Sequence, residues 1–409
     1  MNADVRRLLV AQGLRAFIYG FGSVLLGASL EATGWSELQV GGLLTGVVAG
    51  AALMSLAVGT FADRVGRRRW YAALFLGLAA SGAAFGLSDD FWLLMLVAFA
   101  GTLSTDVVES GPFTSLEQAM LPSGLDARST TRVFGVYNAV AALVGSVGAL
   151  ATGGPALLRD LWGGVPADQR FFLVFVPVGI AGAAVAWSLS DRVEAGRRLK
   201  GRNVPLTRSR GAVYRLSALF ALDSFGGGFI VQSFMAYWFR VKFDVSLEVL
   251  GMLFFGVGLL QTASFLAATR LADRIGLLNT MVFTHLPSNV LLAAVALAPN
   301  LPAAIALLLA RQALSQMDVP TRQAYIALLV HPEERTAAAA YTNTARYAVR
   351  PLGPLLAGAS QQLALGLPFL LGGGIKIVYD IALWLQFRRV PMAHRHDDSE
   401  PVLTTEADV

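Results

Sequence analysis

The sequence predicts an all-α polytopic membrane protein, with twelve transmembrane helices in two pseudo-symmetric six-helix halves. Three observations support this fold class. The 409-residue chain is 55% hydrophobic and only 14% charged, whereas soluble domains carry roughly a quarter charged residues. Apolar runs of about 20 residues, the length that crosses the hydrocarbon layer, recur along the chain. Short sequence patterns also repeat about 210 residues apart.

Twelve segments have the length and composition of membrane-spanning helices. They are 8–31, 37–60, 70–88, 91–115, 131–153, 170–190, 213–239, 246–269, 278–298, 302–327, 337–360 and 366–387. The strongly basic stretch 191–212 is expected to be a cytosolic linker between an N-terminal half, 1–190, and a C-terminal half, 213–389. Residues 390–409 are polar, and we expect them to be a disordered cytosolic tail.

Basic residues gather in alternate loops between these segments. The loops after the second, fourth, sixth, eighth and tenth segments and both terminal stretches hold most of the arginines. The opposite loops hold few basic residues, namely Arg159, Arg170, Arg240 and Lys242. Because basic loops stay on the cytoplasmic side, the pattern places both termini in the cytoplasm. We therefore expect a multi-pass protein of the plasma (inner) membrane.

Several chemistries are disfavoured by composition. The chain has no cysteine, which excludes disulfides and thiolate metal sites. Its four histidines are scattered, apart from two in the tail, which argues against a histidine-built zinc site. No cluster of catalytic groups is visible, so we expect no enzyme activity, no metal and no cofactor. The net charge of +5 reflects topology rather than a nucleic-acid surface.

The two halves repeat one another in sequence. Residues 62–66 read ADRVG and residues 272–276 read ADRIG. Upstream of each copy, four individual positions also carry the same residue at this spacing. Asp106 in LSTDV and Asp318 in LSQMDV lie at nearly the same spacing. Two parallel six-helix repeats around a central cavity are a transporter architecture.

The loop GTFADRVGRRR, residues 59–69, resembles the signature of the major facilitator superfamily. TRLADRIG, residues 269–276, is similar to a degenerate second copy of that signature. The resemblance covers the chain to about residue 390. It implies a transporter that works by alternating access, and says little about the substrate.

The resemblance also implies a latch that holds the two halves together when the cavity faces outward. A carboxylate in this turn can accept hydrogen bonds from the N-terminus of a helix in the other half. The alternative is that the arginines serve only as topology determinants. The latch residues are expected to be Gly59, Asp63, Arg64, Gly66, Arg67, Asp273 and Arg274.

Charged residues inside membrane segments are rare and usually face a cavity. Asp106 and Glu109 have no cation at their depth in the following segment, and an unpaired buried carboxylate takes up protons reversibly. The alternatives are a pair with Arg132 or Arg15, or a wet vestibule. The candidates for proton coupling or substrate binding are Asp106, Glu109, Asp223, Asn138, Arg15 and Arg311.

A charge pair is expected at the inner gate. Counting from the turn between segments ten and eleven places Asp318, Arg346 and Arg350 at a similar depth, around 20 Å along their helices. Since an unpaired buried charge is costly, Asp318 is expected to pair with Arg346 or Arg350. Lys376 and Asp380 lie one turn apart and can pair with each other. Pro320 is expected to bend its helix near this level.

These features predict a secondary active transporter of a small solute, coupled to protons. Export is favoured by the acidic cavity residues and by GPLLAG at 353–358. The alternatives are an uptake permease for organic anions or metabolites and a non-transporting sensor on a transporter fold. The acidic residues favour a cationic or neutral solute, whereas the arginines favour an organic anion. The sign of the charge on the solute therefore stays open. The expected partners are a small-molecule substrate, protons and the lipid bilayer, with no nucleic acid, and the chain is expected to be a monomer.

Overall fold

The computed structural model describes residues 3–106, 111–121, 127–162, 164, 167–198, 206–331 and 334–390. Three predicted features therefore lie outside the described residues: Glu109, the middle of the linker and nearly all of the tail. The backbone of Asp63 is described within a helix, but its side chain is not.

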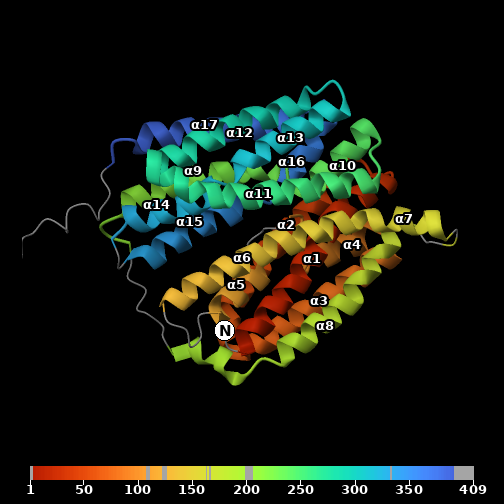
Figure 1. The fold of residues 1–409 in the computed structure, drawn as a ribbon, viewed down its shortest axis with the longest axis horizontal. Coiled ribbons are helices and arrows are strands. Elements are labelled where there is room, and N and C mark those ends of the chain that lie inside the picture. Colours follow the sequence, from red (N-terminus) through yellow and green to blue (C-terminus); the bar gives the residue numbers. More distant parts are fainter. Residues whose placement is uncertain are drawn as a thin grey trace, which may run out of the picture.

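Helices form nearly the whole first half (Figure 1). They are α1 (Ala3–Ala32), α2 (Glu37–Val65), α3 (Arg67–Leu87), α4 (Phe91–Phe99), α5 (Pro112–Met120), α6 (Ala127–Leu150), η1 (Ala151–Gly153), α7 (Gly154–Leu161), η2 (Asp168–Val174) and α8 (Phe175–Trp187). A short 3-10 helix, η3 (Asp191–Arg198), opens the linker.

The second half follows the same plan. Its helices are α9 (Arg210–Gly228), α10 (Gln232–Phe243), α11 (Leu247–Ile275), α12 (Leu277–Ala296), α13 (Leu301–Ser315), α14 (Asp318–Leu329), α15 (Arg335–Val349), α16 (Leu352–Gln361) and α17 (Leu367–Phe387). Among the described residues, nine helices are long and apolar enough to cross a membrane. The other three predicted segments, 91–115, 302–327 and 337–360, are each broken into two shorter helices. The predicted fold class is confirmed.

The sequence repeat has a structural counterpart at the turn between α2 and α3. Gly66 there has φ +112°, and Gly276, at the equivalent turn between α11 and α12, has φ +87°. Each glycine N–H donates to the carbonyl oxygen four residues earlier, at Ala62 and Ala272. Residues with a Cβ rarely adopt such backbone angles, so both copies of the ADR-x-G pattern need their glycine.

The two halves pack closely at the end of the bundle opposite the chain termini, which we call the opposite end. A Cβ added to Gly358 of α16 would lie 2.1 Å from the carbonyl oxygen of Glu37, and one added to Gly27 of α1 would lie 2.2 Å from that of Ser233. Only glycine allows backbones to approach so closely. The Arg240 guanidinium also contacts the Glu31 carboxylate at 3.1 Å across the same interface.

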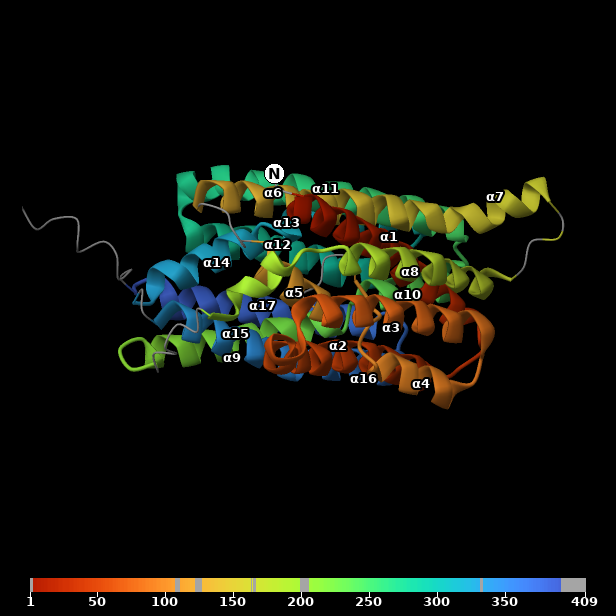
Figure 2. The ribbon, with the colours of Figure 1, turned by 90° about the horizontal axis from the view of Figure 1, so that it is seen from below.

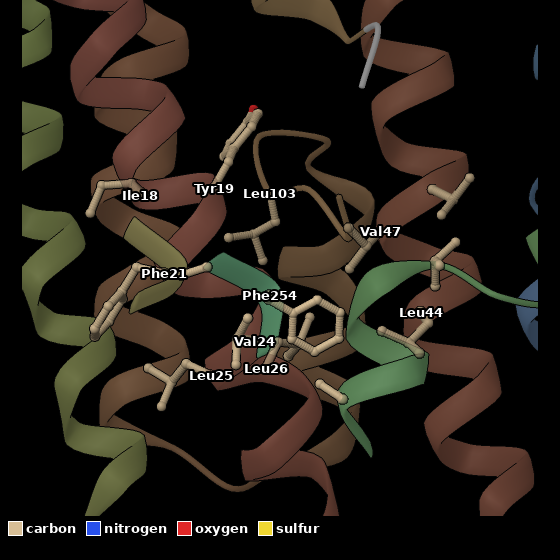
Figure 3. Close-up of a cluster of buried hydrophobic side chains, with 14 of the residues drawn as sticks. Ile18, Tyr19, Phe21, Val24, Leu25, Leu26, Leu44, Val47, Leu103 and Phe254 are labelled. Carbon is tan, nitrogen blue, oxygen red and sulfur yellow. The ribbon is translucent and has the colours of Figure 1, made fainter. Parts of the chain in front are cut away.

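Apolar side chains fill the contact between the halves. Figure 3 shows Phe254 of α11, in the second half, within a buried cluster that includes Val24 and Leu26 of α1 and Leu44 and Val47 of α2. Phe254 is buried, as are its apolar neighbours in that cluster. Toward the end that carries the termini, which we call the terminal end, the ribbons of α6 in the first half and α15 in the second lie apart (Figures 1 and 2).

Two glutamates tie the linker to the terminal end. Glu194 accepts hydrogen bonds from the first two backbone N–H groups of α3, those of Arg67 and Arg68, at 2.9 and 3.0 Å. Glu334 accepts four hydrogen bonds from Thr207, Arg208 and Ser209. These bonds favour the charged carboxylate and lower the pKa of Glu334 well below its ordinary value. Each glutamate fixes one end of the linker to its own half.

Candidate functional site

A polar cavity of about 200 Å³ is lined by residues of the second half and by Asp106 of the first half. Its carboxylates are Asp106, Asp223 and Asp318. Its permanent cations are Arg311, Arg322, Arg346, Arg350 and Lys376. His285 and several glutamines and serines complete the polar lining. Charged groups at such density inside a membrane protein mark a functional site.

The cavity forms where four membrane segments are interrupted. The breaks lie between α4 and α5, α9 and α10, α13 and α14, and α15 and α16. Asp106 lies in the first break, Gln232 opens α10, Asp318 opens α14 and Arg350 follows α15. Pro320 stands in the first turn of α14, so the break comes just before it. Backbone freed from a helix is tolerated at membrane depth when it lines a cavity.

Asp106 joins the two halves. One of its carboxylate oxygens accepts the backbone N–H of Gln232, at the N-terminus of α10, at 2.8 Å. The other oxygen accepts from the Arg350 guanidinium at 2.6 Å. The sequence predicted no cation for Asp106 within its own repeat, and its partners do come from the other half. Of the alternative partners, Arg15 binds Glu117 instead, and the side chain of Arg132 lies outside the described part of the structure.

A connected set of ion pairs occupies the second half. Asp223 of α9 contacts the Lys376 ammonium of α17 and, at 3.5 Å, the Arg322 guanidinium of α14. Arg322 also binds Asp318, four residues earlier on the same helix, at 3.0 Å. All four side chains are more than nine-tenths buried. Such a network is stable only because each charge has an opposite charge in contact.

His285 of α12 extends this network. Its Nδ1 lies 2.8 Å from the Asp380 carboxylate, and its Nε2 lies 3.9 Å from Asp223. The Asn289 amide donates to the second oxygen of Asp380 at 2.8 Å. The ring of Tyr379 lies edge-on to the imidazole. The sequence marks His285 only as one of several scattered histidines, and its carboxylate neighbours come from α17 and α9 through packing.

Two arginines in the lining have no side-chain partner among the described residues. The Nε of Arg311, on α13, and the Nε of Arg346, on α15, are buried without a hydrogen bond. Arg311 is 7% exposed, and the carboxylates of Asp223, Asp106 and Asp318 act on its charge. Each of those carboxylates already contacts another cation.

The predicted gate pair is not formed. Asp318 binds Arg322 rather than Arg346 or Arg350, and Arg350 binds Asp106. Depth along a helix had placed these groups at one level, but the direction in which each side chain points decides which of them meet. The suggested pair of Lys376 with Asp380 is also wrong, because Lys376 binds Asp223 and Asp380 binds His285.

Two candidates lie away from the cavity. Arg15 forms a two-pronged ion pair with Glu117 of α5 at 2.7 and 3.1 Å. The hydroxyls of Tyr71 and Tyr137 donate to the same fully buried carboxylate at 2.7 and 2.5 Å. Asn138 is exposed on α6 and is not among the cavity residues. The sequence reading missed Glu117 because it ended the fourth segment at residue 115.

The predicted latch residues lie at the terminal end. Arg64 is exposed and stacks over Phe61, while Asp273 and Arg274 are exposed on α11. Arg67 donates to the carbonyl oxygen of Ala119 within its own half. A Cβ added to Gly59 would meet nothing within 4 Å, so no described neighbour packs closely against this glycine. Contact of these residues across the halves stays a prediction for a conformation closed at this end.

The comparisons with known proteins agree with this architecture. A protein-family profile described as Major Facilitator Superfamily matches residues 8–354 and 216–406. An uncharacterized membrane protein of Saccharomyces cerevisiae, YJR124C, is 24% identical over 422 aligned residues, which cover 94% of each chain.

Solved transporter structures share the fold. The nucleoside transporter NupG superimposes with a TM-score of 0.72 at 14% identity, covering 95% of this chain and 100% of NupG. The xylose transporter XylE from E. coli, in a partially occluded inward-open conformation, gives 0.70 at 13% identity, covering 96% and 99%. At these identities the likeness concerns the fold alone. With the family profile matching nearly the whole chain, the protein belongs to the Major Facilitator Superfamily.

Proposed function

We propose that this protein is a secondary active transporter, which moves a small polar solute through the central cavity by alternating access. The observation that carries the proposal is a charged cavity to which both halves contribute, Asp106 from the first and the other charged residues from the second, between halves that pack closely at the opposite end. Rocking of one half on the other would expose the same cavity to either side in turn. The relatives of known structure carry solutes as different as nucleosides and xylose, so the fold leaves the solute open.

Distances between spin labels test this movement, because the chain has no native cysteine to remove. One pair, Leu38→Cys with Leu363→Cys, reports the opposite end, and a second pair, Thr60→Cys with Asn343→Cys, reports the terminal end. In lipid nanodiscs at about pH 5.5 and about pH 8, the two distances are expected to shift in opposite senses. Alternating access would be contradicted if both distance distributions were narrow and neither changed with pH or with any metabolite of a panel.

The proposal includes a proton, bound at His285 and Asp380. An imidazole with a carboxylate near each nitrogen is arranged to take a second proton, because each N–H of the imidazolium then has an acceptor. Asp380 accepts at Nδ1 and Asp223 faces Nε2. The charged groups around the pair are Lys376 on α17 and, beyond Asp223, Arg322 on α14. Protonation therefore adds one positive charge to a wall of the cavity.

The direction of transport stays a prediction. Export was favoured by acidic residues thought to be unpaired and by the GPLLAG segment. Asp106 is paired with Arg350, and Gly358 of that segment packs against α2, so neither feature now favours export over uptake. Proteoliposomes that contain the protein in one known orientation, with the solute and the pH gradient set on either side, test the direction.

A further inference from the structure

We infer that the solute carries an oxyanion, a carboxylate, phosphate or sulfonate group, which binds between Arg311 and Arg346. The inference rests on the proposed transport function and names its class of substrate. The cavity lining contains five permanent cations and three carboxylates. Each of these carboxylates contacts a cation, so among the described residues two cations of the lining have no anion in contact.

The unmatched charges reside on two particular side chains. Arg311 is buried, and its Nε has no hydrogen bond among the described residues. Arg346 has Arg322 and Arg350 among its charged neighbours, which repel it, and its Nε is likewise without a partner. A buried guanidinium without an anion in contact is costly, and the described residues place no carboxylate in contact with either group. A guanidinium binds planar or tetrahedral oxyanions with two parallel hydrogen bonds, so an oxyanion fits both groups.

The remaining lining indicates a small and polar solute. The space of about 200 Å³ is below the roughly 300–1,000 Å³ of sites that hold drug-sized ligands. Uncharged amides of Gln261, Gln312 and Gln316 lie around it, with the hydroxyl of Ser315. These groups donate to and accept from hydroxyls and carbonyls of a solute. A bulky apolar cation would leave both arginines unmatched and would meet few apolar walls.

Ligand-induced thermal stabilisation of the purified full chain tests the inference without any transport step. Succinate and glycerol phosphate represent the carboxylate and phosphate sources, and dimethyl succinate and glycerol are their uncharged counterparts. We expect at least one anion to raise the Tm with increasing concentration and its uncharged counterpart not to do so. Arg311→Gln and Arg346→Gln should each weaken the apparent affinity about tenfold or more.

Two control variants separate recognition from folding. Arg270→Gln removes an exposed arginine of α11 outside the cavity and should keep the wild-type response. Arg311→Lys keeps the charge and should recover part of the affinity lost in Arg311→Gln. Equal stabilisation by charged and uncharged compounds, no response to any anion, or an unchanged response in Arg311→Gln would overturn the inference. If the protein then transported an uncharged solute, the inference about the oxyanion would fail while the proposed transport function would hold.

Discussion

The Asp106 carboxylate and the Arg350 guanidinium meet at 2.6 Å, and they come from different halves of the molecule. The same carboxylate accepts the N–H of Gln232 at the start of α10. Asp106 therefore connects the first half to two interrupted helices of the second. Movement of one half on the other must change these contacts, since both partners belong to the opposite half.

Neutralising Asp106 should weaken the closed contact at the opposite end. Asp106→Asn keeps an oxygen that accepts the Gln232 N–H but loses the charge that binds Arg350. We expect a cysteine at Ser360, a buried residue of α16 two positions after Gly358, to react several-fold faster with a membrane-impermeant maleimide in this variant. Asp90→Asn, which changes the exposed N-cap of α4, should leave the rate unchanged. The pair is unimportant if both variants react like the parent.

Breaking the buried pair of Arg15 and Glu117 should destabilise the first half. Glu117→Gln leaves the Arg15 guanidinium buried without a negative charge, which costs about 3–5 kcal/mol. The apparent Tm of the detergent-solubilised protein should fall, while ligand-induced stabilisation at saturation is retained. The double variant Arg15→Met with Glu117→Met should lower the apparent Tm by less than the summed effects of the single variants Arg15→Met and Glu117→Met. Strict additivity would show that the two side chains do not interact.

Glu334 should make the thermal stability of the protein depend on pH in the acidic range. Its pKa is lowered by four donated hydrogen bonds, so its contribution is complete above the ordinary glutamate pKa of 4.5 and is lost as the pH falls below that value. The apparent Tm of the wild type should therefore decline more steeply below about pH 4.5 than that of Glu334→Gln. Asp191→Asn, at a 91% exposed side chain, serves as the control and should follow the wild-type curve. Parallel curves for Glu334→Gln and the wild type would contradict this role.

Much of the architecture was predictable from sequence because it depends on local signals. The length of the apolar runs predicts the membrane segments, and the ADRVG and ADRIG copies predict the repeat of the two halves. The same repeat is seen in the backbone, where Gly66 and Gly276 both have a positive φ. Charge is rare in a membrane helix, and this rarity marks six residues that all line one cavity: Asp106, Asp223, Arg311, Asp318, Arg346 and Arg350.

Pairing was not predictable in the same way. Counting residues fixes the depth of a side chain but not the face of the helix from which it leaves, and interrupted helices change that face at each break. One pair had a usable signal: Asp318 and Arg322 stand four residues apart, a spacing at which helical side chains meet. Glu117 and His285 had none, because their partners are distant in sequence and meet only through packing.

The anion and the proton should favour one another's binding. Protonation of His285 adds positive charge to the cavity wall, so each ligand should raise the affinity of the protein for the other by the same factor. Binding of the stabilising anion should tighten as the pH falls, and Asp380→Asn should flatten this dependence. Calorimetry in two buffers of different ionisation enthalpy measures the protons taken up per anion. Uptake of no protons would contradict the linkage.

Proton movement in proteoliposomes tests the central claim most directly. Vesicles contain a pH-sensitive dye, and the anion that stabilises the purified protein is added outside. The account predicts a solute-dependent pH change inside vesicles with the wild type and with Asp191→Asn. Asp380→Asn and His285→Gln should lose the pH change and still exchange labelled solute for unlabelled solute. A full pH change with Asp380→Asn, or solute movement in the wild type without any pH change, would contradict proton coupling at His285 and Asp380.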